Sequence, residues 1–190
     1  MRDGIDVEFR EVGMRDGLQN VEGFFPTAAK IAWMKAEVAS GMHAIEICSF
    51  VPPKLIPQFK DAAEIVEATH ATDTGDCIIS ALIPNMKGAE RGVELGMKKL
   101  NFVASVSETH NLSNVRRKPE ESIEDFQRIV EMRNALPDQQ KFVIDGGLST
   151  AFGCTMEGNI DPTATVKLAQ QFVEAGAGHL TVCDTVGYAN

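Results

Sequence analysis

The choice of fold rests on one stretch near the start of the sequence, Val7-Glu8-Phe9-Arg10-Glu11-Val12-Gly13-Met14-Arg15-Asp16-Gly17-Leu18-Gln19-Asn20. A strand-like run over Val7–Val12 leads directly into a turn in which glycines stand on either side of an Arg-Asp pair. A dinucleotide-binding sheet would show the pattern GxGxxG after its first strand, and a nucleoside-triphosphate-binding loop would show GxxxxGK. Neither pattern follows a strand-like run here, which disfavours an open nucleotide-binding sheet.

The rest of the chain alternates between short β-rich runs and longer segments in which apolar residues have helical spacing. This alternation predicts strands over Val7–Val12, Ala44–Cys48, Cys77–Ile83, Lys99–Ala104, Phe142–Gly146 and His179–Cys183. It predicts helices over Thr27–Ser40, Phe59–His70, Met86–Leu95, Glu120–Ala135 and Pro162–Ala175. A polar loop is expected over Ser107–Lys118, before the fourth of these helices.

Parallel strands joined by helices fit either an open doubly wound sheet or a (β/α)8 TIM barrel. Polar residues follow the predicted strands at Arg15, Asp16, Glu46, Ser49, Asn85, Ser105, Ser107, Ser149 and Asp184. In a barrel these positions converge on one mouth, where such enzymes keep their chemistry. We therefore predict one α/β domain over residues 1–190, a TIM barrel of which roughly the first six strands are present. Because six strands cannot close the barrel, we expect a longer native protein of about 250 residues or more.

Composition restricts the partners and the location. A hydrophobic content of 44% excludes a disordered chain, and 27 Asp and Glu against 18 Lys and Arg disfavour a nucleic-acid partner. No run approaches the roughly 18 to 20 apolar residues that cross a bilayer, so no membrane partner is expected. Since the first predicted strand leaves no room for a signal peptide, we predict a cytoplasmic protein. The four cysteines are widely spaced and are interpreted as buried thiols.

The Arg15-Asp16 pair is the first candidate for chemistry. Its flanking glycines, Gly13 and Gly17, allow tight backbone turns and the close approach of a ligand. Asp16 can offer an oxygen to a hard divalent cation, and Arg15 can present donors to a carbonyl oxygen that gains negative charge. An ordinary ion pair on a solvent-exposed turn is the alternative interpretation.

Two further carboxylates stand near the same predicted mouth. Regular alternation of side chains along a strand would place Glu46 on the same face as Cys48. If that face is turned to the mouth, Glu46 can pair with Arg15, and a buried carboxylate needs such a partner. Asp184 ends the last predicted strand and is the second carboxylate.

A family resemblance rests on the segments Glu11–Asn20, Ile45–Gln58, Pro84–Gly88, Ser105–Glu108, Glu120–Ser122, Gly153–Gly158 and Asp184–Gly187. These segments, and their order along the chain, resemble those of the hydroxymethylglutaryl-CoA lyases. Such lyases belong to a superfamily of metal-dependent TIM-barrel lyases and synthases. The resemblance runs from about residue 7 to the end of the chain. It implies cleavage of 3-hydroxy-3-methylglutaryl-CoA, or a related 3-hydroxyacyl-CoA, to acetyl-CoA and acetoacetate.

The resemblance also implies roles for individual residues. Asp16 matches a ligand of a divalent cation, Mg²⁺ or Mn²⁺, that chelates the substrate's hydroxyl and a neighbouring carboxylate oxygen. Arg15 matches the arginine that stabilises the thioester enolate, with Glu46 orienting it. Asp184 matches a carboxylate that handles a proton or orients the substrate. Substrate contacts are expected at Gln19, Ser49, Asn85 and Ser107.

Several features of the family's pattern are missing or altered. The family completes its metal site with a His-x-His pair and an Asn on later strands, and a mobile loop supplies a cysteine; the 190 residues contain none of these. We therefore expect this chain alone to bind metal poorly and to be inactive. The histidines, at His43, His70, His110 and His179, lack ligand spacing and are interpreted as surface or structural residues. Pro52 and the stretch Asp145–Ser149 also differ from the family, which leaves the acyl group of the substrate less certain than the reaction.

A basic run ends the expected polar loop. Arg116, Arg117 and Lys118 are consecutive cations, and we predict that Arg116 and Arg117 contact the phosphates of coenzyme A. A solvated run before a helix is the alternative interpretation. An acyl-CoA is thus the expected partner, and a homo-oligomer is expected because barrels of this kind often pair through their helices.

Two other functions are consistent with the sequence. A Claisen-type synthase of the isopropylmalate or citramalate kind shares the superfamily, although Gly17–Asn20 and Ser49–Val51 resemble the lyases more closely. Such a synthase usually carries a regulatory domain after the barrel. A truncated, noncatalytic barrel that acts as an interaction module is the other possibility.

Overall fold

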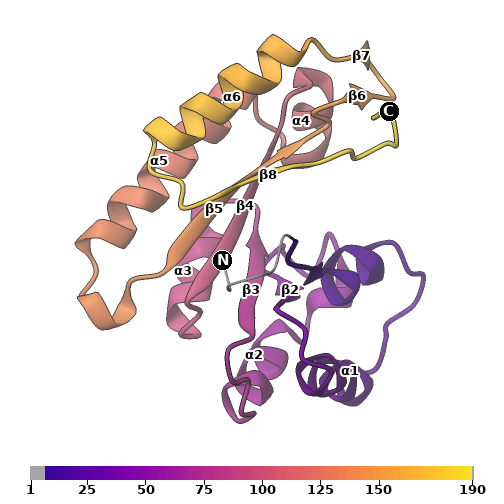
Figure 1. The fold of residues 1–190 in the computed structure, drawn as a ribbon, viewed down its shortest axis with the longest axis vertical. Coiled ribbons are helices and arrows are strands. Elements are labelled where there is room, and N and C mark those ends of the chain that lie inside the picture. The colour runs from indigo at the N-terminus through magenta and orange to yellow at the C-terminus, as the bar shows by residue number, and fades with distance from the viewer. Residues whose placement is uncertain (1–6, 190) are drawn as a thin grey trace.

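The computed structural model describes residues 7–189. Its main sheet contains six parallel strands in the order β1-β2-β3-β4-β5-β8 (Figure 1). These strands are β1 (Arg10–Glu11), β2 (Ala44–Ser49), β3 (Ile78–Ile83), β4 (Lys99–Ser105), β5 (Val143–Ser149) and β8 (Leu180–Val182). A separate antiparallel hairpin consists of β6 (Gly153–Cys154) and β7 (Gly158–Asn159). Because each strand of the main sheet pairs with the next one along the chain, the fold is a partial TIM barrel, as predicted.

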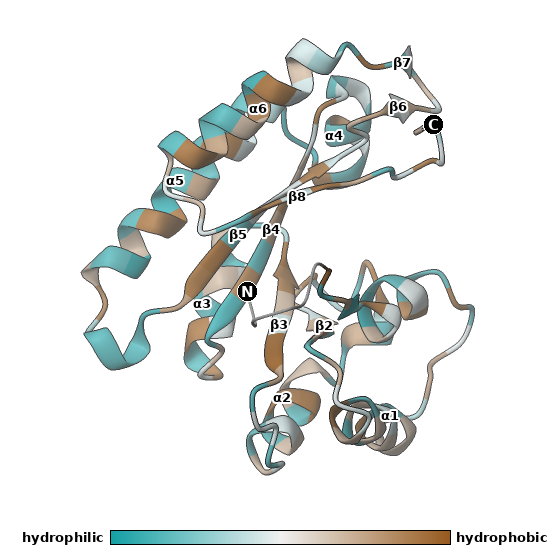
Figure 2. Ribbon diagram, viewed as in Figure 1, coloured by the Kyte–Doolittle hydropathy of each residue, from teal (hydrophilic) through white to brown (hydrophobic). Residues whose placement is uncertain are grey.

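The helices connect the strands and cover the outer face of the sheet. They are α1 (Thr27–Ala39), α2 (Ala62–His70), α3 (Met86–Glu94), α4 (Glu108–Val115), α5 (Pro119–Ala135) and α6 (Pro162–Glu174). Figure 2 shows apolar and polar bands alternating along α5 and α6, the pattern of helices with one buried side. Within residues 7–189, no helix combines the length and the apolar character needed to span a membrane.

An aromatic cluster joins the sheet to the last two helices. Phe102 on β4 packs edge-on against Phe126 of α5 and Phe172 of α6, with ring centroids 4.9 to 6.3 Å apart within the cluster. All three rings are at most 1% exposed. Gly146 on β5 makes room for them, because a Cβ at this position would lie 2.7 Å from the Phe172 ring. The absence of a side chain at Gly146 therefore lets α6 pack directly on the strand.

Strand β2 contains a β-bulge at Ile47. Glu46 lies opposite Ser80 of β3, but Cys48 lies opposite Ala81, so Ile47 is an extra residue in the ladder. Glu46 consequently faces the inside of the sheet, whereas Cys48 packs into the core beneath the helices. Burial raises the pKa of the Cys48 thiol far above its ordinary value. The expectation that Glu46 and Cys48 share a face is wrong, because the bulge interrupts the alternation on which it relied.

The first strand is shorter than the sequence pattern predicts. β1 pairs with β2 only opposite Ala44 and Ile45, and Val7 and Phe9 are 67% and 75% exposed. Among residues 7–189, β1 has no strand on its other side. Apolar side chains before β1 therefore have nothing to pack against, and the strand extends over only two residues.

The polar segment before α5 forms the helix α4 rather than the expected loop. The Ser107 hydroxyl caps this helix by accepting a hydrogen bond from the His110 amide at 3.0 Å. Asn111 is fully buried; its Oδ1 accepts from the Ser105 amide at 2.7 Å, and its Nδ2 donates to the Arg117 carbonyl at 2.9 Å. Buried polar contacts rather than an apolar stripe hold α4, which is why apolar spacing does not predict it.

Candidate functional site

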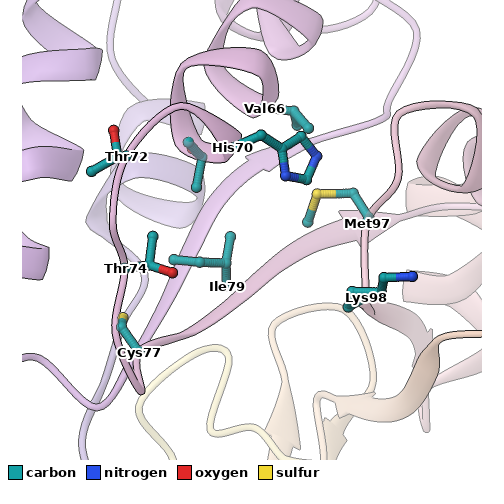
Figure 3. A pocket seen from close by; sticks show the side chains of 9 residues that line it. Val66, His70, Thr72, Thr74, Cys77, Ile79, Met97 and Lys98 are labelled. Carbon is teal, nitrogen blue, oxygen red and sulfur yellow. The ribbon is translucent and has the colours of Figure 1, made fainter. Parts of the chain in front are cut away.

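The concave face of the sheet borders a cavity of about 1320 Å³. Inward-facing side chains from all six strands of the main sheet contribute to its wall. The wall includes the predicted site residues Arg15, Asp16, Gln19, Glu46, Asn85, Arg116, Arg117 and Asp184. A smaller cavity of about 260 Å³ lies between α2 and the starts of β3 and β4, where His70, Cys77 and Met97 line it (Figure 3). It contains none of the predicted site residues, so the concave face is the candidate site.

A tight turn carries Arg15 to the edge of the cavity. Residues Gly13–Gly17 form one π-helical turn, in which three consecutive amides, beginning with that of Arg15, donate to the Val12 carbonyl at 2.7 to 3.4 Å. A Cβ at Gly13 would lie 2.9 Å from the Trp33 ring of α1, whereas the space around Gly17 is open. Close packing on α1 thus requires glycine at Gly13 but not at Gly17.

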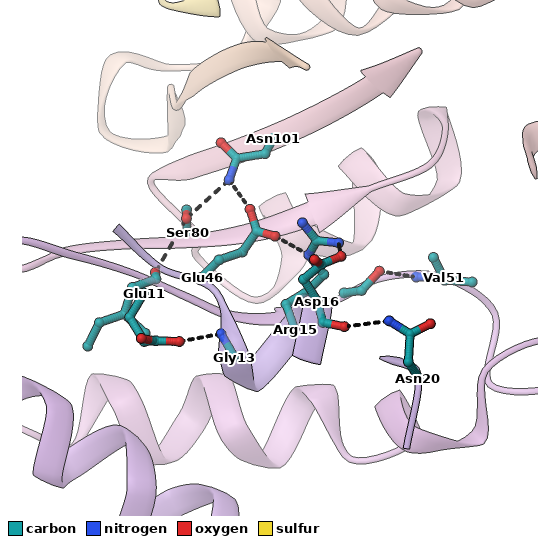
Figure 4. A network of polar contacts seen from close by, with 11 residues as sticks. Glu11, Gly13, Arg15, Asp16, Asn20, Glu46, Val51, Ser80 and Asn101 are labelled. Carbon is teal, nitrogen blue, oxygen red and sulfur yellow. Dashed lines mark hydrogen bonds and ion pairs between the residues drawn. The ribbon is translucent and has the colours of Figure 1, made fainter. Parts of the chain in front are cut away.

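Arg15 and Glu46 form a buried ion pair in the wall of the cavity (Figure 4). Arg15 Nε donates to Glu46 Oε1, and Arg15 Nη1 donates to Asp16 Oδ1 at 2.7 Å. The Glu46 side chain is 3% exposed and the Arg15 side chain 17%. Among residues 7–189, no acceptor bonds the third nitrogen, Arg15 Nη2. The predicted pairing is confirmed, and it leaves part of the guanidinium available to a ligand in the cavity.

Asp16 is the most accessible carboxylate of this group. Its side chain is 59% exposed, and its backbone carbonyl accepts a hydrogen bond from Asn20 Nδ2 at 3.1 Å (Figure 4). A carboxylate oxygen is a suitable ligand for Mg²⁺ or Mn²⁺. Residues 7–189 nevertheless contain no group of three or more His, Cys, Asp or Glu side chains placed to hold a metal ion. Asp16 therefore fits as one ligand of such an ion, and the described residues do not complete a site.

Asp184 and Asn85 face the cavity while they bond to the backbone. Asp184 Oδ1 accepts from the Tyr188 amide at 2.8 Å, and Oδ2 accepts from the Ala189 amide at 3.1 Å. Asn85 Oδ1 caps α3 by accepting from the Gly88 amide at 3.0 Å. Both side chains hold local turns, and their roles toward a substrate stay predictions.

Ser49 and Ser107 lie behind the cavity wall. Both are fully buried, and neither contributes to the wall. Ser49 Oγ accepts from the Val51 amide at 3.2 Å, while Ser107 caps α4. Ser107 also bonds the Cys154 thiol. Burial alone would raise the pKa of this thiol, but hydrogen bonds from Ser107 and from two backbone amides lower the pKa by more. The structure thus gives these serines contacts within the protein and no direct exposure to the cavity.

The basic run divides into one anchored and one unpaired arginine. Arg117 Nη1 lies 2.6 Å from Oδ2 of Asp125, a carboxylate whose side chain is only 5% exposed. Arg116 ends α4 in the left-handed conformation, with φ of 57°, and has no ion-pair partner within residues 7–189. Both arginines line the cavity. The run is therefore not uniformly solvated, and Arg116 is the cation left available to a ligand.

Sequence reasoning missed several polar residues near the cavity, among them Ser80, Asn101 and His110. His110 lies on α4 in the cavity wall, where its Nδ1 is 2.7 Å from Ser105 Oγ. Burial lowers the pKa of His110, although nearby Glu157 opposes the change. Asn101 bonds Glu46, and Ser80 bonds Asn101. The sequence does not single out Asn101, because β4 reads KLNFVAS and contains other polar residues.

Comparisons with known proteins show the family of the chain. Residues 6–190 match the family model described as HMGL-like. The chain is 34% identical over 184 residues to the hydroxymethylglutaryl-CoA lyase YngG of Bacillus subtilis, which covers 97% of this chain and 60% of that relative. It is 32% identical to a 3-hydroxy-3-isohexenylglutaryl-CoA/hydroxymethylglutaryl-CoA lyase of Pseudomonas aeruginosa, covering 95% of this chain and 58% of the relative.

A solved structure shows the same likeness in three dimensions. An HMG-CoA lyase from Acinetobacter baumannii, in complex with coenzyme A and 3-methylmalate, superposes with a TM-score of 0.85 and 39% identity. The match covers 95% of this chain and 57% of that one. The chain thus spans about 60% of the length of the proteins that it matches.

Proposed function

The chain belongs to the HMGL-like family, and from this membership we propose that it forms part of a metal-dependent carbon–carbon lyase. The proposed reaction cleaves 3-hydroxy-3-methylglutaryl-CoA, or a related 3-hydroxyacyl-CoA, to acetyl-CoA and acetoacetate. The observation that carries the proposal is the Arg15–Glu46 pair, which is buried on one side and open to the cavity on the other. The likeness of the chain to lyases of three bacteria supports the reaction class.

Arg15 would stabilise the charge that develops during cleavage. When the carbon–carbon bond breaks, its electron pair moves toward the thioester carbonyl and leaves an enolate oxygen. Arg15 is held by Glu46 and Asp16 before any substrate arrives, so its donors need no reorganisation as that charge appears. Such a fixed cation lowers the barrier because it binds the enolate more strongly than the starting thioester.

The remaining chemistry involves the two carboxylates that face the cavity. Asp16 would hold a Mg²⁺ or Mn²⁺ ion, which when bound makes the substrate's hydroxyl more acidic. Asp184 would take up that hydroxyl proton or orient the hydroxyl for its loss. Both carboxylates line the same cavity as Arg15, which supports assigning them to one reaction.

Acyl-CoA binding is proposed along α4 and the turn that follows it. Arg116 and Arg117 line the cavity and would contact the phosphates of coenzyme A, while Gln19 and Asn85 would contact the acyl portion. The Acinetobacter relative was solved with coenzyme A, which supports a ligand of this class. Ser49 and Ser107 would act through the backbone turns that they hold, because they do not reach the cavity.

The cellular location and the oligomeric state of the protein are also proposed. We propose a cytoplasmic protein on the basis of its four free cysteines, which suit a reducing compartment. A homo-oligomer is proposed by analogy with other barrels that pair through their helices.

The first experiment measures the intact mass of the native protein and then its activity with 3-hydroxy-3-methylglutaryl-CoA and Mg²⁺. We expect a mass near that of a complete barrel and formation of acetoacetate that chelators abolish. A native protein of 20.6 kDa without such activity would refute the lyase and favour a noncatalytic interaction module. Condensation of acetyl-CoA with a keto acid in place of cleavage would identify a synthase of the same superfamily.

A further inference from the structure

Asn101 stands at an inward position of β4, directly beside the Arg15–Glu46 pair. It pairs in register with Leu82 of β3 on one side and Asp145 of β5 on the other. The residue is 8% exposed and contributes to the wall of the large cavity. A buried amide requires hydrogen-bond partners, because its donors and acceptor have left water.

The Asn101 amide nitrogen bonds two side chains of neighbouring strands (Figure 4). Nδ2 donates to Glu46 Oε2 and, at 3.2 Å, to Ser80 Oγ. The Ser80 hydroxyl in turn donates to the Ile45 carbonyl at 3.3 Å, so its oxygen is free to accept from the amide. Every bond in this chain therefore has one defined donor, which fixes the orientation of the amide.

The two oxygens of Glu46 have different partners as a result. Oε1 accepts from Arg15 Nε, and Oε2 accepts from Asn101 Nδ2. With only the first bond, the carboxylate could rotate about its terminal torsion and carry the guanidinium with it. With both bonds, the plane of the carboxylate is set from two sides, one in η1 (Gly13–Gly17) and one in β4.

We propose that Asn101 is a positioning residue of the site, whose amide holds Glu46 in the orientation that directs Arg15 toward the cavity. The inference rests on the proposed function, because the role of Arg15 in catalysis comes from there. It also accounts for the Asn101 acceptor, since Oδ1 is buried without a hydrogen-bond partner within residues 7–189. The Asn101 nitrogen bonds Glu46 while the Asn101 oxygen is left without a hydrogen bond in the described part of the chain. The contact with Glu46 therefore determines the orientation of the amide.

The decisive variants alter the donor at this position and keep the rest of the network. Asn101→Leu has a similar size and no donor, whereas Asn101→Gln keeps an amide donor on a longer stem. In the full-length native protein, we expect Asn101→Leu to lower kcat about 10- to 100-fold, as loss of a supporting hydrogen bond typically does, with little change in KM. Asn101→Gln should recover most of that loss. Asn134→Leu, at an exposed position of α5, serves as the matched control for amide removal.

A second measurement follows Arg15 directly and needs no activity. The Nε–H of Arg15 donates to buried Glu46 and should give a slowly exchanging NMR signal in the wild-type protein. In Asn101→Leu we expect this proton to exchange at least about tenfold faster, because the carboxylate is no longer fixed. The signal should stay unchanged in Asn134→Leu.

The outcomes separate the two proposals. A protein without lyase activity but with faster Arg15 exchange in Asn101→Leu would refute the proposed function and keep the positioning role. An active protein whose kcat and Arg15 signal are unaffected by Asn101→Leu would overturn the positioning role and leave the lyase intact. A fall in kcat with equal losses in Asn101→Gln and Asn134→Leu would also overturn it, because the effect would not depend on the donor.

Discussion

Two buried ion pairs in this molecule use the same chemistry for different ends. Lys30 of α1 pairs with Asp61, which begins α2, and Arg15 pairs with Glu46 beside the cavity. The Lys30 and Asp61 side chains are 3% and 4% exposed, whereas Arg15 is 17% exposed. An ion pair that is fully enclosed can serve stability only, whereas a pair that is open on one side can also bind a ligand.

The Lys30–Asp61 pair is closed on all sides. Lys30 Nζ contacts both Asp61 oxygens at 2.9 and 3.1 Å, donates to the Gln58 carbonyl, and lies 4.4 Å from the Phe24 ring. Thr27 Oγ1 donates to Asp61 Oδ2 at 2.9 Å. These contacts tie the loops after β1 and β2 to the starts of two helices, and no side of the pair is left for a ligand.

The Arg15–Glu46 pair is closed on the Glu46 side only. Glu46 is bonded through both oxygens, but Arg15 keeps a nitrogen without an acceptor among residues 7–189. Protein donors and acceptors that remain unmatched at a cavity are the features that bind a ligand. The difference predicts that breaking the first pair affects folding most, and that breaking the second affects activity most.

The largest expected effect is on folding, from Lys30→Met. The substitution leaves the Asp61 charge buried with Thr27 as its remaining side-chain donor. We expect the free energy of unfolding to fall by about 3 to 5 kcal/mol, measured by urea denaturation. Lys60→Met is the control, since Lys60 is exposed and also lies over the Phe24 ring, at 3.9 Å. Equal losses in the two variants would show that enclosure is not what distinguishes Lys30.

Glu46→Gln breaks the Arg15–Glu46 pair and should affect activity more than stability. Arg15 keeps Asp16 as a partner and remains partly hydrated, so we expect a loss of only about 1 to 2 kcal/mol in unfolding free energy. The activity of the full-length native protein should fall about 10- to 100-fold in kcat, because the guanidinium loses the charge that orients it. Steady-state kinetics and urea denaturation of one preparation test both parts. A stability loss as large as that of Lys30→Met would remove the distinction between the pairs.

A third ion pair, between Arg117 and Asp125, is the most exposed of the three. Arg117 is 26% exposed and its partner Asp125 5%, and Asp125 also contacts Arg128 at 2.8 Å. We expect Arg117→Ala to lower the unfolding free energy by about 1 kcal/mol, and Arg116→Ala to leave it unchanged. Both variants should raise KM for an acyl-CoA but not for a pantetheine analogue. Equal effects on the two substrates would exclude contact with the phosphates.

The smallest expected effect is on the pH dependence of stability and involves His110, which contacts Ser105. Because burial lowers the pKa of His110 from its ordinary value of 6.5, the unfolded chain binds a proton more readily than the folded chain just below that pH. Stability therefore falls as the pH drops from 7 through 6. Glu157 acts in a separate, lower window, since bonds with Thr109 lower its pKa and the resulting stability is lost as pH falls below 4.5.

The measurement is urea denaturation of the wild-type protein and of His110→Asn at pH 7 and pH 5.5. The variant should lose less stability over this interval, because it no longer has the imidazole that the unfolded chain protonates. His70→Asn is the control, at an imidazole that bonds the Leu95 carbonyl at 2.8 Å outside the large cavity. An identical pH dependence in wild type and His110→Asn would contradict the role of burial at His110.

The sequence predicts the fold well where local pattern and tertiary contacts agree. Strand β2 and helix α6 lie within a residue of their expected limits, because apolar periodicity and a Pro in the first turn mark them. The Arg15–Glu46 pairing follows from the cost of burying a carboxylate alone. Both are consequences of nearest-neighbour chemistry that a single sequence carries.

The errors come from contacts between different strands and helices. No local pattern marks Ile47 as an extra residue, because the bulge depends on how β2 pairs with β3. Helix α4 depends on Asn111, whose partners lie on β4 and α5. Asn101 was missed because its role appears only when β2, β3 and β4 lie side by side. Such residues are recognised from the assembled sheet rather than from the order of amino acids.

The bulge at Ile47 also bears on which changes in length the chain can accept. Surface loops commonly tolerate the gain or loss of a residue, whereas a regular strand does not, since one step exchanges its two faces. In β2 the extra residue is already built in, between an inward Glu46 and an outward Cys48. Deleting Ile47 would convert β2 to a regular strand that still has Glu46 inward and Cys48 outward, because adjacent residues of a strand face opposite sides. The cost of that deletion is the loss of the Ile47 side chain, which is 1% exposed and packs in the hydrophobic core.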